Sequence, residues 1–173
     1  MTKKTILLLV LLLFIVGILI FYFYPEKKLP SNSVIDHIKV YKSKRQLLAY
    51  NNGKLLKTYR ISLGKNPIGH KEFEGDSKTP EGIYYINDKN PNSGYYKNLG
   101  VSYPNEKDMA YAKTLGKSAG GDIKIHGLRN GIGFLGKFQR YTDWTAGCIA
   151  VTNNEIDELF TNVKIGVKIE ILP

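Results

Sequence analysis

The stretch Ile123-Lys-Ile-His-Gly-Leu-Arg-Asn130, together with Trp144-Thr-Ala-Gly-Cys-Ile-Ala-Val-Thr-Asn153, decides how this 173-residue chain is organised. It carries the only cysteine of the protein, Cys148, and one of its three histidines, His126. Both lie at the edge of short apolar runs rich in β-branched residues, where strands end and side chains can point into a cleft. A cysteine attacks a carbonyl as its thiolate, and a neighbouring imidazole is the usual base that generates one. The two motifs therefore predict a cysteine acyl-transfer site.

The N-terminal segment has the composition of a membrane-spanning helix. A charge-free apolar run extends from Ile6 to Tyr24, close to the ~20 residues that cross a bilayer as a helix. It is longer than a typical signal-peptide core, lacks a small-x-small cleavage site and ends in four aromatic residues suited to the interface. We expect an anchor over residues 1–25 and a polar linker over residues 26–34, with a cleaved signal segment as the alternative. Either interpretation places the rest of the chain outside the cytoplasmic membrane.

The residue counts limit the chemistry open to this chain. Outside the cytoplasm cysteines normally pair, so a lone Cys148 indicates a reactive thiol or an intermolecular bridge; the alternative is a small buried hydrophobe. One cysteine and three histidines without ligand spacing also argue against a zinc site, and we expect neither a metal nor another cofactor. The formal net charge of +10 calls for an anionic partner. No nucleic-acid-binding motif is present, so anionic wall polymers or the outer leaflet are the expected partners.

From about residue 35 onward the pattern is mainly that of β-strands. Residues His37–Lys42 alternate apolar and polar side chains, and Gln46–Tyr50 and Lys54–Leu63 flank the tight-turn signal Asn51-Asn-Gly53, which predicts a three-stranded meander. Further strands are expected at Ile83–Ile86, Leu99–Tyr103, Ile123–His126, Cys148–Val151 and Val167–Ile171.

Two short helices interrupt these strands. One is expected over Asn105–Leu115, ending at Gly116, and the other from the capping-box spacing Thr152–Glu155 to about Phe160. The remaining segments are expected to be a long loop over 64–78, a turn-rich stretch over 87–94, and a loop or lid over the cleft at 130–143. The sum is a mainly-β domain over residues 35–173, and the pattern leaves a barrel and a sandwich both open.

Three pieces of sequence resemble the YkuD-type L,D-transpeptidase catalytic domain, and more narrowly its YafK-like branch. They are Gly75–Ile86, Ile125-His-Gly127 and Thr145–Asn153, and the resemblance extends over about Ile35 to Pro173. It implies the β-sandwich or barrel of that family. It also implies that Cys148 attacks a peptidoglycan stem-peptide carbonyl to form a thioester, that His126 is the base, and that the Gly127 carbonyl orients the histidine.

The resemblance gives expectations for the rest of the site. The backbone N–H groups of Gly147 and Cys148 are expected to stabilise the oxyanion. An arginine guanidinium can bind a substrate carboxylate through two parallel hydrogen bonds. For Arg140 and Arg129 the alternative is a solvated charge in a loop. The candidates for oxyanion stabilisation and substrate binding are Gly147, Thr145, Trp144, Arg140 and Arg129.

The chain departs from the commoner family pattern at two positions. Ala146 stands where a histidine is common, and Ala150 where an arginine often follows. The resemblance implies transfer when an amine accepts the acyl group and cleavage when water does. An L,D-peptidase that trims stem peptides or detaches a wall-linked lipoprotein is therefore the alternative to a transpeptidase. A non-catalytic wall-binding module is a second alternative. The resemblance also implies that carbapenems acylate the catalytic cysteine.

Overall fold

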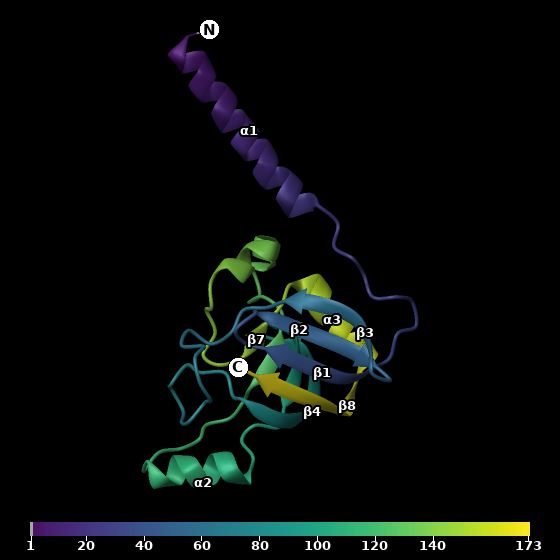
Figure 1. Ribbon diagram of the computed structural model, residues 1–173, viewed down its shortest axis with the longest axis vertical. Helices are drawn as coiled ribbons and strands as arrows, with labels where there is room; N and C mark the ends of the chain where they lie inside the picture. Colours follow the sequence, from purple (N-terminus) through teal and green to yellow (C-terminus); the bar gives the residue numbers. More distant parts are fainter. Residues whose placement is uncertain (1) are drawn as a thin grey trace.

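The computed structural model describes residues 2–173, and Figure 1 shows a β-rich domain from which one long helix projects. That helix, α1, spans Lys3–Phe23 and buries none of its residues against the domain. Its mean hydropathy of 3.3 and its 21 residues are sufficient, by length and composition, to cross a membrane. The predicted apolar helix is confirmed.

Eight strands form one continuous sheet. Its order is β3-β2-β1-β8-β4-β5-β6-β7. The β1–β8 and β6–β7 pairs are parallel and the other neighbours are antiparallel. The strands are β1 (Ile35–Tyr41), β2 (Gln46–Asn51), β3 (Lys54–Arg60), β4 (Gly82–Ser93), β5 (Tyr96–Val101), β6 (Lys124–His126), β7 (Ile149–Ala150) and β8 (Val163–Leu172).

The two edges of this sheet are joined to each other. Just beyond β3, the Ser62 N–H donates to the Ala150 carbonyl at 2.9 Å, and the Ala150 N–H donates back at 2.8 Å. A second bridge links Gly64 and Thr145. Joined edges leave no free ladder at this point, so the sheet curls into a barrel-like layer around a core of aliphatic and tyrosine side chains. The structure thus decides between the two open architectures in favour of the barrel-like one.

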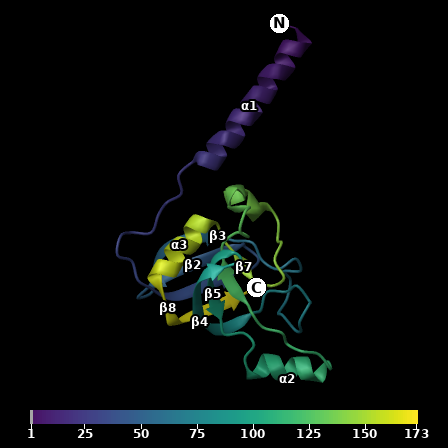
Figure 2. The same cartoon turned by 180° about the vertical axis from the view of Figure 1, so that it is seen from behind.

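Two α-helices complete the domain, as predicted. The helix α3, Asn153–Asn162, begins at a capping box between Thr152 and Glu155 and packs against β5 and β6 (Figure 2). The helix α2, Glu106–Thr114, is capped by Asn105 and protrudes at the end of the molecule opposite α1 (Figure 1).

Two segments differ from the sequence prediction. Residues 87–93 of the predicted turn-rich stretch are part of the long strand β4, whose ladder with β5 shifts register twice. Those bulges accommodate Pro91 and the Asn and Asp residues that signalled a turn. The segment 130–143 contains a short 3-10 helix, η1 (Gly133–Tyr141), that contacts the end of α1. None of its residues lines the cleft that holds Cys148, so the segment does not cover that cleft in this structure.

Candidate active site

A cleft of about 360 Å³ lies beside the short parallel pair β6–β7. Because Ile125 pairs with Ile149, Cys148, just before β7, comes beside Lys124. Alternate residues of a strand share a face, so Lys124 and His126 point to the same side and all three line the cleft. The residues that line it are Lys65, Ser77, Tyr95, Asp122, Lys124, His126, Trp144, Thr145, Ala146 and Cys148. The two motifs singled out in the sequence therefore meet in space.

The protonation of His126 follows from its hydrogen bond. Its Nδ1 lies 2.6 Å from the Gly127 carbonyl oxygen. A carbonyl only accepts hydrogen bonds, so Nδ1 carries the proton and, in the neutral ring, Nε2 keeps its lone pair. The ring is 4% exposed, and this burial lowers the pKa of His126, although the Gly127 carbonyl partly opposes it. The imidazole is thus held neutral with one nitrogen free to accept a proton.

The thiol of Cys148 is protonated at rest. Burial raises the pKa of Cys148, while the Lys124 backbone N–H and charge act against this rise. The Sγ atom contacts the Asp122 carbonyl oxygen at 3.5 Å, with the sulfur as donor. Because the same burial lowers the pKa of His126, the resting pair is a neutral thiol and a neutral imidazole.

A tight turn presents Cys148 to the cleft. Gly147 has φ +134°, and a Cβ built on it would lie 2.7 Å from the Lys78 carbonyl oxygen, so only glycine fits here. The Thr145 hydroxyl accepts a hydrogen bond from the Gly147 N–H at 3.1 Å and donates one to the Cys148 carbonyl at 2.8 Å. The Gly147 N–H is therefore occupied within the turn, and the expectation that it serves as an oxyanion donor is wrong for this conformation. Across residues 2–173, no protein atom accepts a hydrogen bond from the Cys148 N–H.

Two aromatic rings pack against the histidine and against each other, with the Tyr95 and Trp144 ring centroids 6.1 Å apart. The Tyr95 ring centroid lies 4.6 Å from that of His126, and Trp144 packs edge-on to the same ring at 5.6 Å. The Trp144 indole N–H donates to the Gln139 side-chain oxygen at 3.0 Å, which fixes the ring. Sequence reasoning identified Trp144 but missed Tyr95, because Tyr95 follows a stretch expected to be a turn.

The cations at the cleft are lysines. Arg140 is buried in ion pairs with Glu26 at 2.7 Å and Glu155 at 2.8 Å and lines a different cavity. Arg129 is exposed and does not line the cleft. The structure therefore brings neither predicted arginine into the cleft.

The two basic residues that line the cleft are Lys65 and Lys124. Lys124 pairs with Asp122 at 3.2 Å, whereas Lys65 is exposed and has no carboxylate within 4.0 Å in the described part of the chain. Within the same described part, no group of three or more His, Cys, Asp or Glu residues is placed to hold a metal ion.

Cys148 can be approached from two sides. A second depression of about 350 Å³ shares Asp122, Ala146 and Cys148 with the main cleft. Its other walls are Lys71, Glu74, Gly75, Gly120, Gly121 and Ile123. Cys148 therefore borders two depressions.

Comparisons with known proteins agree on a family. Residues 35–171 match the YkuD family, described as the L,D-transpeptidase catalytic domain. "Putative L,D-transpeptidase YafK" of Escherichia coli (strain K12) is 32% identical over 130 residues, which cover 72% of this chain and 45% of that protein.

Solved structures give the same answer for the fold. The helical cell shape determining protein Pgp2 from Campylobacter jejuni is 29% identical, with TM-score 0.59, over 81% of this chain and 48% of that one. Bd1075 of Bdellovibrio bacteriovorus is 25% identical, with TM-score 0.56, over 83% and 49% respectively. The chain spans about half the length of these relatives.

Proposed function

The chain belongs to the YkuD family of L,D-transpeptidase catalytic domains, and on that premise we propose that it is a cysteine acyltransferase acting on peptidoglycan stem peptides. Cys148 is the nucleophile, His126 the base and the Gly127 carbonyl the group that orients the base. One observation carries the proposal. The 2.6 Å contact between Nδ1 and the Gly127 oxygen leaves Nε2 as a proton acceptor in the cleft that also holds the thiol.

The reaction follows from two neutral partners. As the Cys148 sulfur attacks the substrate carbonyl carbon, its proton moves to Nε2 of His126, and the new C–S bond leaves the former carbonyl oxygen as an oxyanion. We assign the oxyanion donor to the Cys148 N–H, which makes no hydrogen bond with another described residue. When the tetrahedral intermediate collapses, the C–N bond breaks and the leaving amine takes the proton from the imidazolium. A thioester on Cys148 remains.

The second half of the reaction uses the same base. An amine or a water molecule attacks the thioester, gives its proton to His126, and releases the thiolate, which recovers that proton. The second depression, which also reaches Cys148, supports a separate route for the attacking group. With an amine the outcome is transpeptidation, and with water it is L,D-peptidase activity.

The cleft walls suit a carboxylate-bearing peptide. Lys65 lies at the mouth without an ion-pair partner among the described residues, and Lys124 has one exposed partner, Asp122. Both cations can therefore meet substrate carboxylates. Tyr95 and Trp144, whose ring centroids lie 6.1 Å apart, offer apolar faces beside His126. We assign substrate binding to these four residues, in place of the two arginines.

We also propose that α1 anchors the protein in the cytoplasmic membrane, with residues 26–34 as linker and residues 35–173 as the catalytic domain on the outer side. The support is the length and composition of α1, which buries no residue in the domain. A single cysteine in that compartment suits a working thiol, since the chain offers it no pairing partner.

The test is turnover of a stem tetrapeptide that ends in a D-residue, with and without an added D-amino acid. Exchange of the terminal residue indicates transfer, and shortening alone indicates the peptidase. If a wall-linked lipoprotein were the physiological substrate, release of its peptide conjugate would replace tetrapeptide shortening. Cys148→Ala should abolish either product, and His126→Gln should slow both by about 10²–10⁴-fold. Product formation by Cys148→Ala at the wild-type rate would refute the proposal.

A further inference from the structure

Large apolar side chains in and next to the segment η1, Gly133–Tyr141, are exposed, and two of them, Phe138 and Tyr141, contact each other. Phe134 and Tyr141 are each 68% exposed. Isolated apolar residues are ordinary on a protein surface, but a contiguous group of large ones usually marks an interaction site. We call this group the η1 patch, and its members are Ile132, Phe134, Leu135, Phe138 and Tyr141.

The η1 patch is continuous with the aromatic end of α1. Phe138 stacks on Tyr22 with ring centroids 5.8 Å apart and lies 5.7 Å from Phe21. The Tyr22 hydroxyl donates to the Phe134 carbonyl at 2.6 Å. Figures 1 and 2 both show η1 lying beside the domain-facing end of the helix. The exposed rings of η1 therefore extend the aromatic surface in which α1 ends.

Ion pairs hold this arrangement from the domain side. Arg140 pairs with Glu26, just beyond α1, and with Glu155 of α3. The Lys137 ammonium donates to the Phe21 carbonyl oxygen at 3.2 Å, at the end of α1. The helix end, the η1 segment and the catalytic domain are thus tied together by charged and aromatic contacts.

We propose that the η1 patch seats the catalytic domain on the outer leaflet of the bilayer that α1 crosses, a proposal that rests on the proposed anchoring. An aromatic helix end lies at the level of the lipid headgroups, and side chains continuous with it lie at the same level. Phenylalanine and leucine enter the acyl boundary while lysine stays with anionic headgroups. A nine-residue linker, 26–34, could extend about 30 Å, so the tether alone would leave the domain free to swing. The η1 contacts remove that freedom.

Gln139 connects the η1 segment to the cleft. Its backbone carbonyl accepts a hydrogen bond from the Ser62 hydroxyl at 2.7 Å, next to the bridge that joins the sheet edges. Its side-chain oxygen accepts the bond from Trp144, a cleft wall. Seating η1 on lipid therefore fixes how the cleft is turned relative to the membrane, and it favours stem peptides of the wall layer nearest the membrane.

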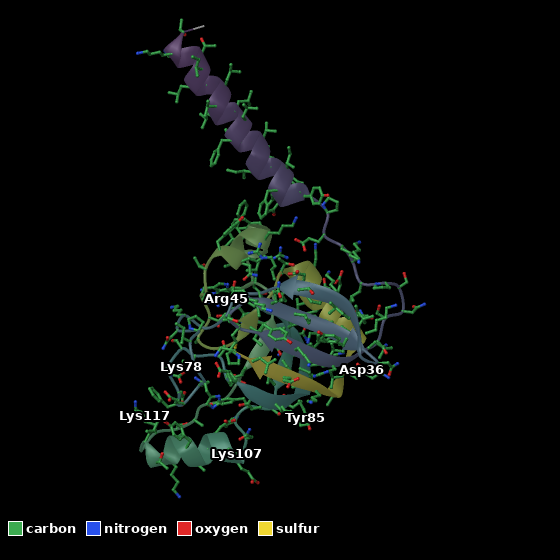
Figure 3. All side chains as sticks on the ribbon, in the orientation of Figure 1. Asp36, Arg45, Lys78, Tyr85, Lys107 and Lys117 are labelled. Atoms are coloured by element: carbon green, nitrogen blue, oxygen red, sulfur yellow. The ribbon has the colours of Figure 1, made fainter. Side chains whose placement is uncertain are left out.

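The test places a fluorescent reporter on η1 in the full chain. Trp144, the only tryptophan, is first replaced in Trp144→Phe, and F134W is then compared with Y111W, whose position on α2 is exposed. Figure 3 shows Lys107 of α2 at the end of the molecule opposite α1. Both variants are placed in phosphatidylethanolamine–phosphatidylglycerol vesicles with brominated acyl chains, which quench a nearby indole.

The expected result is a blue-shifted F134W emission, quenched at least about twofold more strongly than that of Y111W, because only the first indole reaches the acyl boundary. Equal, weak quenching at both positions, in chains that float with the vesicles, would refute the contact between the η1 patch and the lipid. If the chains did not float with the vesicles, both this contact and the membrane anchoring by α1 would be refuted. Neither readout uses the thiol chemistry, so the acyltransferase proposal stands or falls separately on stem-peptide turnover.

Discussion

Replacing Thr145 with valine removes one oxygen atom from the turn that presents Cys148, with little change in shape. That oxygen makes two hydrogen bonds, from the Gly147 N–H at 3.1 Å and to the Cys148 carbonyl at 2.8 Å. Thr145 is 5% exposed, so water does not readily replace it. Each buried group left without a partner costs about 1–3 kcal/mol. Since the two share one turn and are not additive, we expect a total loss of about 2–4 kcal/mol in the free energy of unfolding.

The same change should slow thioester formation. The turn sets the position of the Cys148 N–H, the proposed oxyanion donor, relative to Sγ. If about 1.4 kcal/mol of the loss is felt there in the transition state, acylation slows about tenfold. The stability change is measured by thermal unfolding of the detergent-solubilised chain, where a loss of this size lowers Tm by roughly 5–15 °C. Acylation is followed by intact-mass spectrometry after a carbapenem is added.

The matched control is Thr142→Val, because Thr142 is exposed and its side chain makes no hydrogen bond with another described residue. It should leave both Tm and the acylation rate near the wild-type values. If Thr145→Val matched Thr142→Val in both measurements, the reasoning that this hydroxyl orders the nucleophile turn would be refuted.

Three further outcomes are expected. The acylation rate should fall as pH is lowered through the pKa of His126, which burial holds below its usual value near 6.5. The reason is that only the neutral ring accepts the thiol proton, so a rate that rises with acidification would contradict this role. Lys65→Gln should raise KM for a carboxylate-bearing peptide by up to about fivefold, the equivalent of about 1 kcal/mol for an exposed ion pair, while the surface variant Lys54→Gln leaves KM unchanged. If the two variants had the same KM, Lys65 would have no role in substrate binding. Gly147→Ala should lower the acylation rate at least about tenfold, because alanine at this positive φ adds strain of about 1–3 kcal/mol and its Cβ would contact the backbone. Gly94 has open space around it, so Gly94→Ala is the control that we expect to be tolerated.

Much of the fold follows from local patterns in the sequence. Alternating side chains and the Asn51-Asn-Gly53 turn predict β2 and β3, and the capping box predicts the start of α3. These features are local, so short-range rules suffice for them. The extension of β4 through residues 87–93 is different, because pairing with β5 overrides the turn preference of its Asn, Asp and Pro residues.

The site residues also divide into those with a local sequence signal and those placed by long-range contacts. His126 and Cys148 could be identified because each lies in a short motif whose residue types indicate the chemistry. The burial of Arg140 away from the cleft could not be predicted, because its position in a loop does not reveal that Glu26, distant in sequence, pairs with it. Tyr95 reaches His126 only through the pairing of β5 with β6, a long-range contact without a local signature.

The most direct test of the central claim is the intact mass of the full chain after exposure to a carbapenem, compared between the wild type and Cys148→Ala. An activated thiol in an acyl-binding cleft predicts one covalent adduct per wild-type chain, located on Cys148 by peptide mapping, and none on the variant. An adduct that persists in Cys148→Ala, or a wild-type chain as unreactive as the variant, would contradict the account. The second result would favour a wall-binding module with an inert cysteine.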